Sequence, residues 1–101
     1  MAQIVWSKLA QADLENIHEY IARDSPYFAQ KTIEEFFIAV TVLLKYPEVG
    51  REVPEFLRKD TREIIQGNYR FFYKFRRKNI FIIRVHHSAQ NISLKGKSTS
   101  R

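Results

Sequence analysis

The segment 61–87 constrains the fold more than any other part of the chain, because it has the pattern of three consecutive β-strands. It reads TREIIQGNYRFFYKFRRKNIFIIRVHH, and strands favour its aromatic and β-branched residues. Gly67-Asn68 and Lys78-Asn79 interrupt the pattern, and Gly and Asn tolerate the positive φ angles of two-residue turns. We therefore expect strands at about 61–66, 69–77 and 80–87.

Two helices are expected in the N-terminal half, after a short strand over residues 3–6. Ser7 can cap the first helix, and the spacing of apolar residues extends it to about Arg23. Ser25-Pro26 suits the start of the second helix, because proline lacks the N–H that would be unpaired at the first helical position. Helical spacing then continues to about Tyr46, where the following proline ends the helix.

The expected order of elements is β-α-α-β-β-β, with residues 47–60 forming a long surface loop. This order predicts an α+β domain in which an antiparallel helical hairpin packs on one face of a small, mainly antiparallel sheet. A chain of 101 residues suits one domain. We assign residues 1–91 to that domain and residues 92–101 to a polar C-terminal tail.

Alternation of side chains along each strand gives the predicted sheet two distinct faces. The apolar set expected to pack against the helices is Ile64, Tyr69, Phe71, Tyr73, Phe75, Ile80 and Ile82. Arg62, Arg84 and His86 share this parity, so they should lie at the rim of that face, where their polar ends can reach water.

The opposite face is the predicted binding surface. It should carry Arg70, Lys74, Arg76 and His87 among the apolar residues Ile65, Phe72, Phe81, Ile83 and Val85. Pairing residue 77 with residue 80 across the second turn would set Arg70 directly opposite His87. No further helix is expected to cover this face, and an open, basic and partly apolar surface is typical of a binding site.

Charge is distributed unevenly along the chain. Residues 1–48 contain four Lys and Arg against seven Asp and Glu, a balance of −3, whereas residues 49–101 contain thirteen against four, a balance of +9. This asymmetry favours an acidic or polyanionic partner for the C-terminal half, and a basic surface with no such partner is the alternative. The run Arg76-Arg77-Lys78 falls in a predicted turn, where it is either a solvated cluster or a phosphate contact.

Several classes of protein are excluded by composition. The chain has no cysteine, which rules out disulfides and thiolate catalysis. No apolar run reaches the roughly 20 residues that a membrane helix needs, and no signal peptide is recognisable, so we expect a cytoplasmic protein. Consecutive strand residues such as His86 and His87 point to opposite faces, so neither a metal site nor another cofactor is predicted.

One ordered set of residues resembles the RelE/ParE superfamily, the toxins of bacterial type II toxin–antitoxin operons. The set consists of Trp6, Ala10, Asp13-Leu14, Ile17 and Tyr20-Ile21, then Pro47-Glu48-Val49-Gly50-Arg51, Arg62-Glu63-Ile64, Tyr69-Arg70-Phe71-Phe72-Tyr73, and Ile83, Val85 and His87. The resemblance extends to about Asn91. It implies a compact α+β fold, a growth-arresting target and a partner antitoxin, for which we predict the surface Ile65, Phe72, Phe81, Ile83 and Val85.

The superfamily divides by target. ParE-like members bind DNA gyrase, and the helical hairpin, the Pro-Glu-Val-Gly-Arg loop and the VHHS ending of this chain look ParE-like. RelE-like members cut mRNA on the ribosome and commonly place an arginine near the end of the last strand and a tyrosine soon after, where this chain has Gln90 and Leu94.

The resemblance therefore favours a gyrase inhibitor of the plasmid-stabilisation type, with target-binding residues Arg70, Lys74, Arg76 and His87. The alternative is a ribosome-dependent mRNA endonuclease whose catalytic residues would be Arg70, Lys74 and His87. A degenerate toxin that only binds its antitoxin is a third interpretation.

Overall fold

The computed structural model describes residues 2–53 and 60–88. In chain order the elements are β1 (Ile4–Trp6), α1 (Lys8–Ala22), α2 (Pro26–Val40), α3 (Val42–Lys45), β2 (Arg51–Glu52), β3 (Arg62–Gln66), β4 (Tyr69–Arg76) and β5 (Asn79–His87). The five strands form one sheet in the order β1-β5-β4-β3-β2, in which β1 runs parallel to β5 and the other pairs are antiparallel. The predicted fold class, a helical hairpin on a mainly antiparallel sheet, is confirmed.

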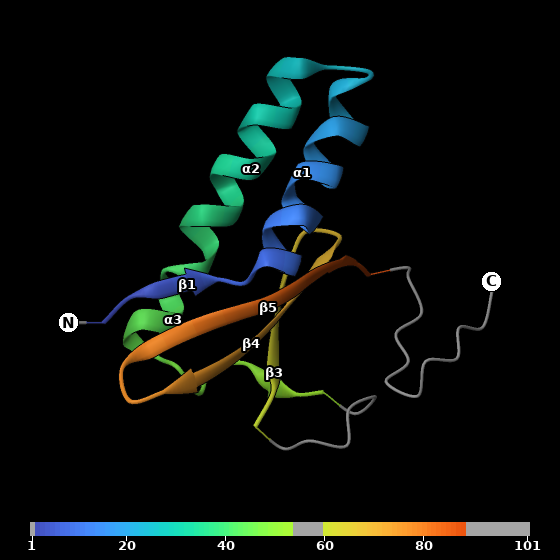
Figure 1. Cartoon of the computed structure of the whole chain (residues 1–101). Coiled ribbons are helices and arrows are strands. Elements are labelled where there is room, and N and C mark those ends of the chain that lie inside the picture. The colour runs from blue at the N-terminus through green and yellow to red at the C-terminus, as the bar shows by residue number, and fades with distance from the viewer. Residues whose placement is uncertain (1, 54–59, 89–101) are drawn as a thin grey trace.

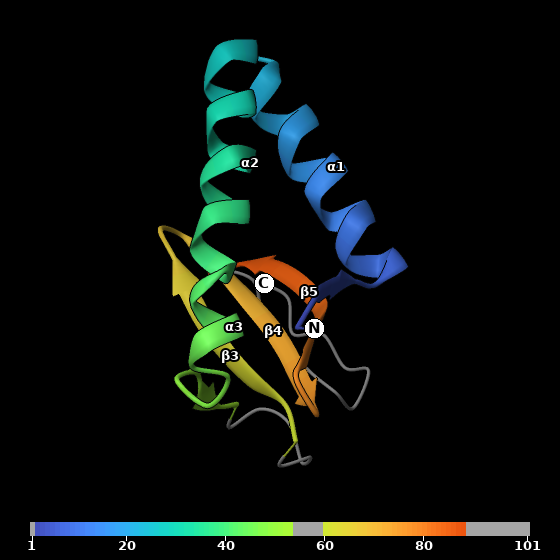
Figure 2. The ribbon, with the colours of Figure 1, turned by 90° about the vertical axis from the view of Figure 1, so that its left-hand side faces the viewer.

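The hairpin of α1 and α2 packs against the sheet at its lower end only. Figures 1 and 2 both show its tip, where the chain passes from α1 to α2, standing well away from the strands. None of the helices in the described ranges has the length and apolar character to span a membrane. The predicted tail, residues 92–101, and the neighbouring Gln90 lie outside the described residues, so the domain assignment 1–91 stays a prediction.

Helix starts follow the predicted caps. The Ser7 hydroxyl accepts a hydrogen bond from the Ala10 N–H at 3.0 Å, and the Ser25 hydroxyl accepts one from Phe28 at 3.1 Å. The second helix ends earlier than predicted, because Thr41 interrupts it and donates its hydroxyl to the Ile38 carbonyl at 2.7 Å. The chain then continues as the four-residue α3.

The hydrophobic core lies between the hairpin and one face of the sheet. It contains the buried residues Ala10, Leu14, Phe36, Val40, Leu43, Phe71, Tyr73, Ile80, Ile82 and Val85, with Ile64, Tyr69 and Phe75 packed against them. Edge-to-face ring contacts join the layers, with centroids 5.0 Å apart for Phe36–Phe71 and 5.3 Å for Trp6–Phe37. All seven residues predicted for the helix-facing side of the sheet lie there.

Residues 47–53, predicted as part of a loop, are fastened to the sheet and contain β2. The buried Tyr73 hydroxyl donates to the Pro47 carbonyl at 2.7 Å and accepts from the Gly50 N–H at 2.9 Å. Arg62 donates to the Gly50 carbonyl at 2.7 Å. Gly50 has no space for a side chain, because an added Cβ would lie 2.6 Å from the Tyr73 hydroxyl. The Pro-Glu-Val-Gly-Arg loop of the superfamily resemblance is therefore hydrogen-bonded to the strand motifs that contain Arg62 and Tyr73.

The predicted register between β4 and β5 is wrong. The turn pairs Arg76 with Asn79, not residue 77 with residue 80, and the register shifts again between Phe72 and Tyr73. Arg70 consequently lies opposite His86. Strand alternation assumes an unbroken ladder, and a β-bulge adds one residue to one strand and so reverses every later side chain. Beyond the shift, Val85 lies in the core and His87 lines a pocket beside α1, whereas His86 pairs with Arg70 and contacts the Phe72 ring.

Candidate functional site

The sheet face away from the helices contains an acid between two arginines. Glu63, whose side chain is 0% exposed, accepts hydrogen bonds from Nε of Arg51 on β2 and from Nε of Arg70 on β4, the latter at 2.6 Å. The Arg70 guanidinium also lies 5.0 Å over the Phe72 ring. We predicted an exposed Arg70, but it is buried, because its charge is balanced by the one acid of the strand beside it.

Two residues predicted to bind an antitoxin are buried. Phe72 is 1% exposed beneath Arg70 and beside the His86 ring, whose centroid is 5.6 Å away. Val85 belongs to the core on the helix side, as the register shift requires. The other three positions reach the surface to different extents. Ile65 is 56% exposed, Phe81 is 37% exposed and Ile83 is half-buried.

His86 occupies the place that we predicted for His87. It pairs with Arg70 across the ladder, and its two ring nitrogens are buried with no hydrogen-bond partner among the described residues. Burial lowers the pKa of His86, the nearby positive charges of Arg84 and Arg70 lower it further, and only Asp13 raises it. His86 is therefore a neutral imidazole at physiological pH.

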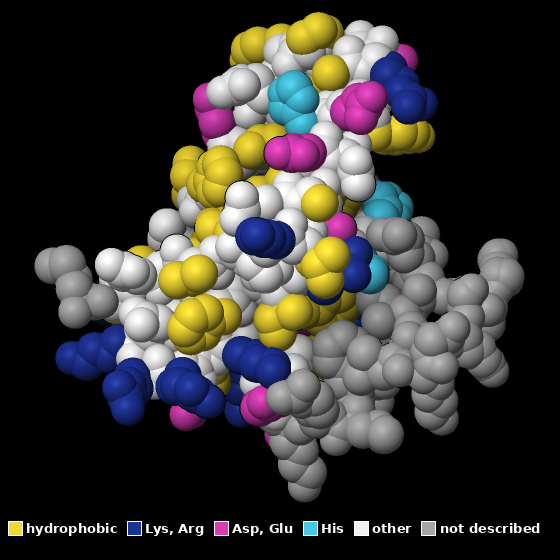
Figure 3. All heavy atoms as spheres, in the orientation of Figure 1, with side chains coloured by type: hydrophobic (Ala, Val, Ile, Leu, Met, Phe, Trp, Pro, Cys, Tyr) yellow, Lys and Arg dark blue, Asp and Glu magenta, His cyan; other side chains and the backbone are white. Residues whose placement is uncertain are grey.

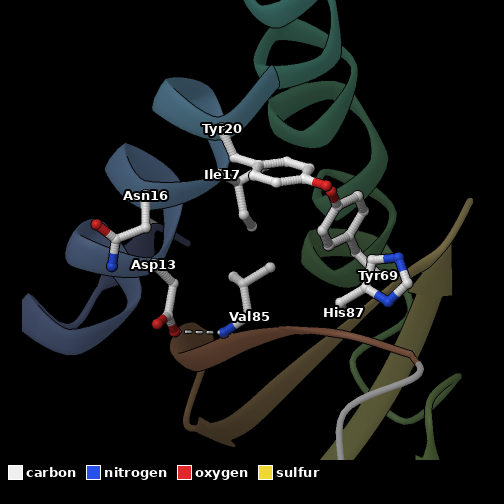
Figure 4. A pocket seen from close by; sticks show the side chains of 7 residues that line it. All are labelled: Asp13, Asn16, Ile17, Tyr20, Tyr69, Val85 and His87. Carbon is white, nitrogen blue, oxygen red and sulfur yellow. Dashed lines mark hydrogen bonds between the residues drawn. The ribbon is translucent and has the colours of Figure 1, made fainter. Parts of the chain in front are cut away.

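His87 lines a pocket on the helix side of the sheet (Figure 4). The pocket has a volume of about 530 Å³ and is lined by Asp13, Asn16, Ile17, Tyr20, Tyr69, Val85 and His87. Tyr20 reaches from α1 toward Tyr69, whose pKa is raised by burial and by the neighbouring Tyr20. Asp13 accepts a hydrogen bond from the Val85 N–H at 2.8 Å. The predicted cluster of Arg70 and His87 is thus divided between two faces.

The remaining cations of the sheet fall into two groups. Arg84 donates to both carboxylate oxygens of Asp13, at 2.9 and 3.0 Å, which raises the pKa of Arg84, and Lys74 lies 3.6 Å from Asp60. The second group lies at the β4–β5 turn. Arg76, Arg77 and Lys78 are exposed, and their side chains form no ion pair within the described ranges. Arg77 has φ 59°, a backbone conformation that favours glycine.

This geometry limits the chemistry of the open face. Its central arginine is held by a buried carboxylate and its histidine is enclosed, so no exposed cation and proton-transfer group converge within the described residues. No group of three or more potential metal ligands occurs there either. Sequence reasoning missed the roles of Glu63 and Arg51. Glu63 is the only acid between residues 61 and 87. It lies two residues before Ile65, the residue that pairs with Arg70, so its side chain points to the same face of the sheet as that of Arg70.

Comparison with known proteins identifies the family. Residues 4–92 match the model of a family described as the ParE toxin of the type II toxin–antitoxin system, parDE. The chain belongs to the ParE toxin family. It is also 34% identical over 90 residues to Toxin RelE2 of Caulobacter vibrioides, an alignment that covers 89% of this chain and 99% of that toxin. The predicted membership of the RelE/ParE superfamily is confirmed, and the chain is a toxin of a type II toxin–antitoxin system.

Solved structures share the fold of this ParE-family toxin. The chromosomal ParDE system of P. aeruginosa contains a chain that matches with a TM-score of 0.70 at 22% identity, covering 86% of this chain and 96% of that one. The toxin–antitoxin complex RelBE2 of Mycobacterium tuberculosis matches with a TM-score of 0.58 at 22% identity, covering 84% and 95%. At this identity the likeness establishes the architecture alone.

Proposed function

We propose that this ParE-family toxin arrests growth in the cytoplasm by binding DNA gyrase and that a cognate antitoxin neutralises it. The separation of Arg70 from His87 carries this proposal. Cutting RNA requires a cation that stabilises the phosphate and a group that transfers protons, both within reach of the same bond. Here the arginine is engaged by Glu63, and His87 lines a pocket on the opposite face. Target binding needs no such pair.

For the target surface we propose the part of the open face that reaches solvent. Lys74 and Arg76 follow each other along this face of β4, and Phe81 pairs with Lys74 across the ladder. Arg70 lies four residues before Lys74 on β4 and has a supporting role in this proposal, because its guanidinium packs over Phe72 and is bonded to Glu63. His87 would contact gyrase only if the target also reached the pocket beside α1.

For the antitoxin we propose the helical hairpin in place of the sheet. With Phe72 and Val85 buried, the hairpin exposes more large apolar side chains than the open face, among them Phe28, Phe37 and Ile38. Figure 3 shows apolar surface along this hairpin. A groove of about 330 Å³ between α1 and α2 is lined by Gln11, Leu14, Glu15, His18, Ile33 and Phe37. Such a groove fits the apolar face of an amphipathic helix.

The antitoxin surface can be tested by two substitutions of the same kind. Phe37→Asp should weaken binding of the purified antitoxin severely, and Ile65→Asp on the sheet should have little effect, as measured by calorimetry. A severe loss of binding in Ile65→Asp with little effect of Phe37→Asp would instead place the antitoxin on the sheet face.

The target can be tested with purified components. The toxin should inhibit DNA supercoiling by gyrase and leave translation in a cell extract unchanged. Lys74→Gln combined with Arg76→Gln should relieve the inhibition, and His87→Gln should not. Cleavage of mRNA that depends on ribosomes, with no effect on gyrase, would contradict the proposal.

A ribosome-dependent mRNA endonuclease is the second candidate, and the position of His86 favours it. This histidine lies across the ladder from Arg70 with two unbonded ring nitrogens. If the toxin cuts RNA, the proton-transfer residue should be His86, with Arg70 and Lys74 as the cations. His86→Gln would then abolish cleavage and His87→Gln would not.

A further inference from the structure

The unpaired positive charge of the sheet is concentrated at the β4–β5 turn. The arginines of the open face share the buried Glu63, Arg84 is bound to Asp13, and Lys74 lies beside Asp60. Only at the turn do three consecutive cations, residues 76–78, stand exposed with no ion pair among the described residues. Lys and Arg side chains gather in Figure 3 at the edge where Figure 1 places this turn. The charge of these three cations is therefore available to a partner at this edge.

The backbone of the turn indicates that its cations are more than a solvated cluster. The two hairpins of the sheet each place one residue at positive φ, Gly67 at 61° and Arg77 at 59°. Glycine adopts this conformation without strain, whereas a residue with a Cβ does so at a cost in stability. Non-glycine residues held in such a conformation cluster at functional positions. A guanidinium at the position that suits glycine is consistent with a contact made by its side chain.

The surroundings of the turn suit phosphate groups and offer little to an acidic peptide. Strands β4 and β5 pair with each other up to Arg76 and Asn79, whereas β3 pairs with β4 only as far as Tyr73. Residues 76–79 contain no apolar side chain. Affinity at this place must come from charge alone, and the release of counterions from a polyelectrolyte supplies such affinity. Arginine also grips phosphate oxygens with two parallel hydrogen bonds.

The surface beside the turn indicates which form of nucleic acid fits this site, double-stranded or single-stranded. A hollow of about 400 Å³ beside the turn is lined by Asp60, Lys74, Phe75, Arg76 and Phe81. Single strands are held by stacking successive bases on several exposed rings. Among the described residues, the open face offers one exposed ring, that of Phe81 at 37%, because Phe72 is buried. This arrangement fits contact with a phosphate backbone better than contact with unstacked bases.

We propose that the β4–β5 turn binds the phosphate backbone of double-stranded DNA through Arg76, Arg77 and Lys78. The site adjoins the proposed gyrase surface, with which it shares Arg76, and it is separate from the antitoxin groove. It predicts affinity that depends on salt and not on base sequence.

The test uses the full chain and a fluorescently labelled 20-base-pair duplex, with binding followed by anisotropy from 50 to 300 mM salt. The variant Arg76→Gln/Arg77→Gly/Lys78→Gln should bind at least tenfold more weakly at the lowest salt. Its salt slope should fall by up to about 2.7, which is 0.9 for each of three phosphate contacts. The matched control Lys8→Gln/Lys31→Gln/Lys45→Gln removes the same charge from the helices and should stay within about twofold of the wild type.

The single variant Arg77→Gly separates binding from folding. It relieves the positive-φ strain, so its thermal midpoint should rise while its affinity for the duplex falls. Equal losses of affinity in the turn variant and the helix control would overturn the proposal. So would binding of a single strand or of a polyglutamate peptide as tightly as the duplex, or unchanged affinity in Arg77→Gly.

Discussion

The Glu63 cluster and the β4–β5 turn use similar side chains in opposite ways. In the cluster, two arginines share one buried carboxylate, and one of them is itself buried. At the turn, three cations stand in solvent with no acid paired to them in the described structure. The first arrangement joins β2, β3 and β4 into one surface, and the second leaves charge available for a partner.

The difference shows that the positive charge of a segment does not by itself predict that the segment forms a binding surface. Residues 61–87 contain cations throughout, yet three of those within the strands, Arg62, Arg70 and Arg84, are bonded to other parts of the protein. Arg62, for example, supports the Gly50 carbonyl, and Arg84 joins β5 to Asp13 of α1. Residues that carry a family resemblance can thus serve to stabilise the fold.

Removing the acid of the cluster should have the largest effect on stability. Glu63→Ala leaves Arg70 as a buried charge without its carboxylate, and breaking a buried pair in this way costs about 3–5 kcal/mol. Urea denaturation would measure the loss. Glu52→Ala, an exposed acid on the adjacent strand β2, is the control and should change the unfolding free energy by less than about 0.5 kcal/mol. A loss below about 1 kcal/mol for Glu63→Ala would contradict the account.

A substitution at Gly50 should have the next largest effect. The added methyl group of Gly50→Ala would meet the Tyr73 hydroxyl at 2.6 Å and the Glu63 carbonyl at 2.7 Å, and overpacking of this kind costs about 1–3 kcal/mol. Gly67→Ala is the comparison, because its site is open and only the positive φ opposes it, at about 1–2 kcal/mol. Tyr73→Phe should leave part of the cost of Gly50→Ala, because the Cε1 atom of residue 73 and the Glu63 carbonyl, both at 2.7 Å, remain in place. An effect of Gly50→Ala no larger than that of Gly67→Ala would show that the loop can move.

The pH dependence of stability should identify the enclosed histidine. Because the pKa of His86 is lowered in the folded protein, the unfolded chain binds a proton first as the pH falls. The unfolding free energy should therefore be fully retained above about pH 6.5 and should decrease below it. His86→Leu should reduce this slope between pH 5 and 7. The same slope in wild type and His86→Leu would mean that another group is responsible.

The smallest effect on stability is expected at the turn. Lys78→Gln removes an exposed charge that makes no ion pair with a described residue, so the unfolding free energy should change by less than about 0.5 kcal/mol. Thermal denaturation at low and high salt would measure it. A loss of 1 kcal/mol or more would place this lysine in the folded framework together with the cluster.

The architecture was predictable because it depends on local signals. Ser7 and Ser25-Pro26 begin their helices as the sequence indicates, and alternation identifies the apolar side of the sheet. The site was less predictable for two physical reasons. The bulge at Phe72/Tyr73 comes from tertiary packing and has no signature in turn residues, so it reversed His86 and His87. A strand of two residues, β2, is too short to show a period, and the partner it brings to Glu63 was missed.

The central claim is that Arg70 forms a buried ion pair with Glu63, whereas the exposed Arg76 is available to bind a partner. A double-mutant cycle tests it most directly, with Glu63→Gln, Arg70→Met, Arg76→Met and the two double variants measured by urea denaturation. The account predicts a coupling free energy of about 1–3 kcal/mol between Glu63 and Arg70, and less than about 0.5 kcal/mol between Glu63 and Arg76. Coupling near zero for the first pair, or equal coupling for both, would contradict it.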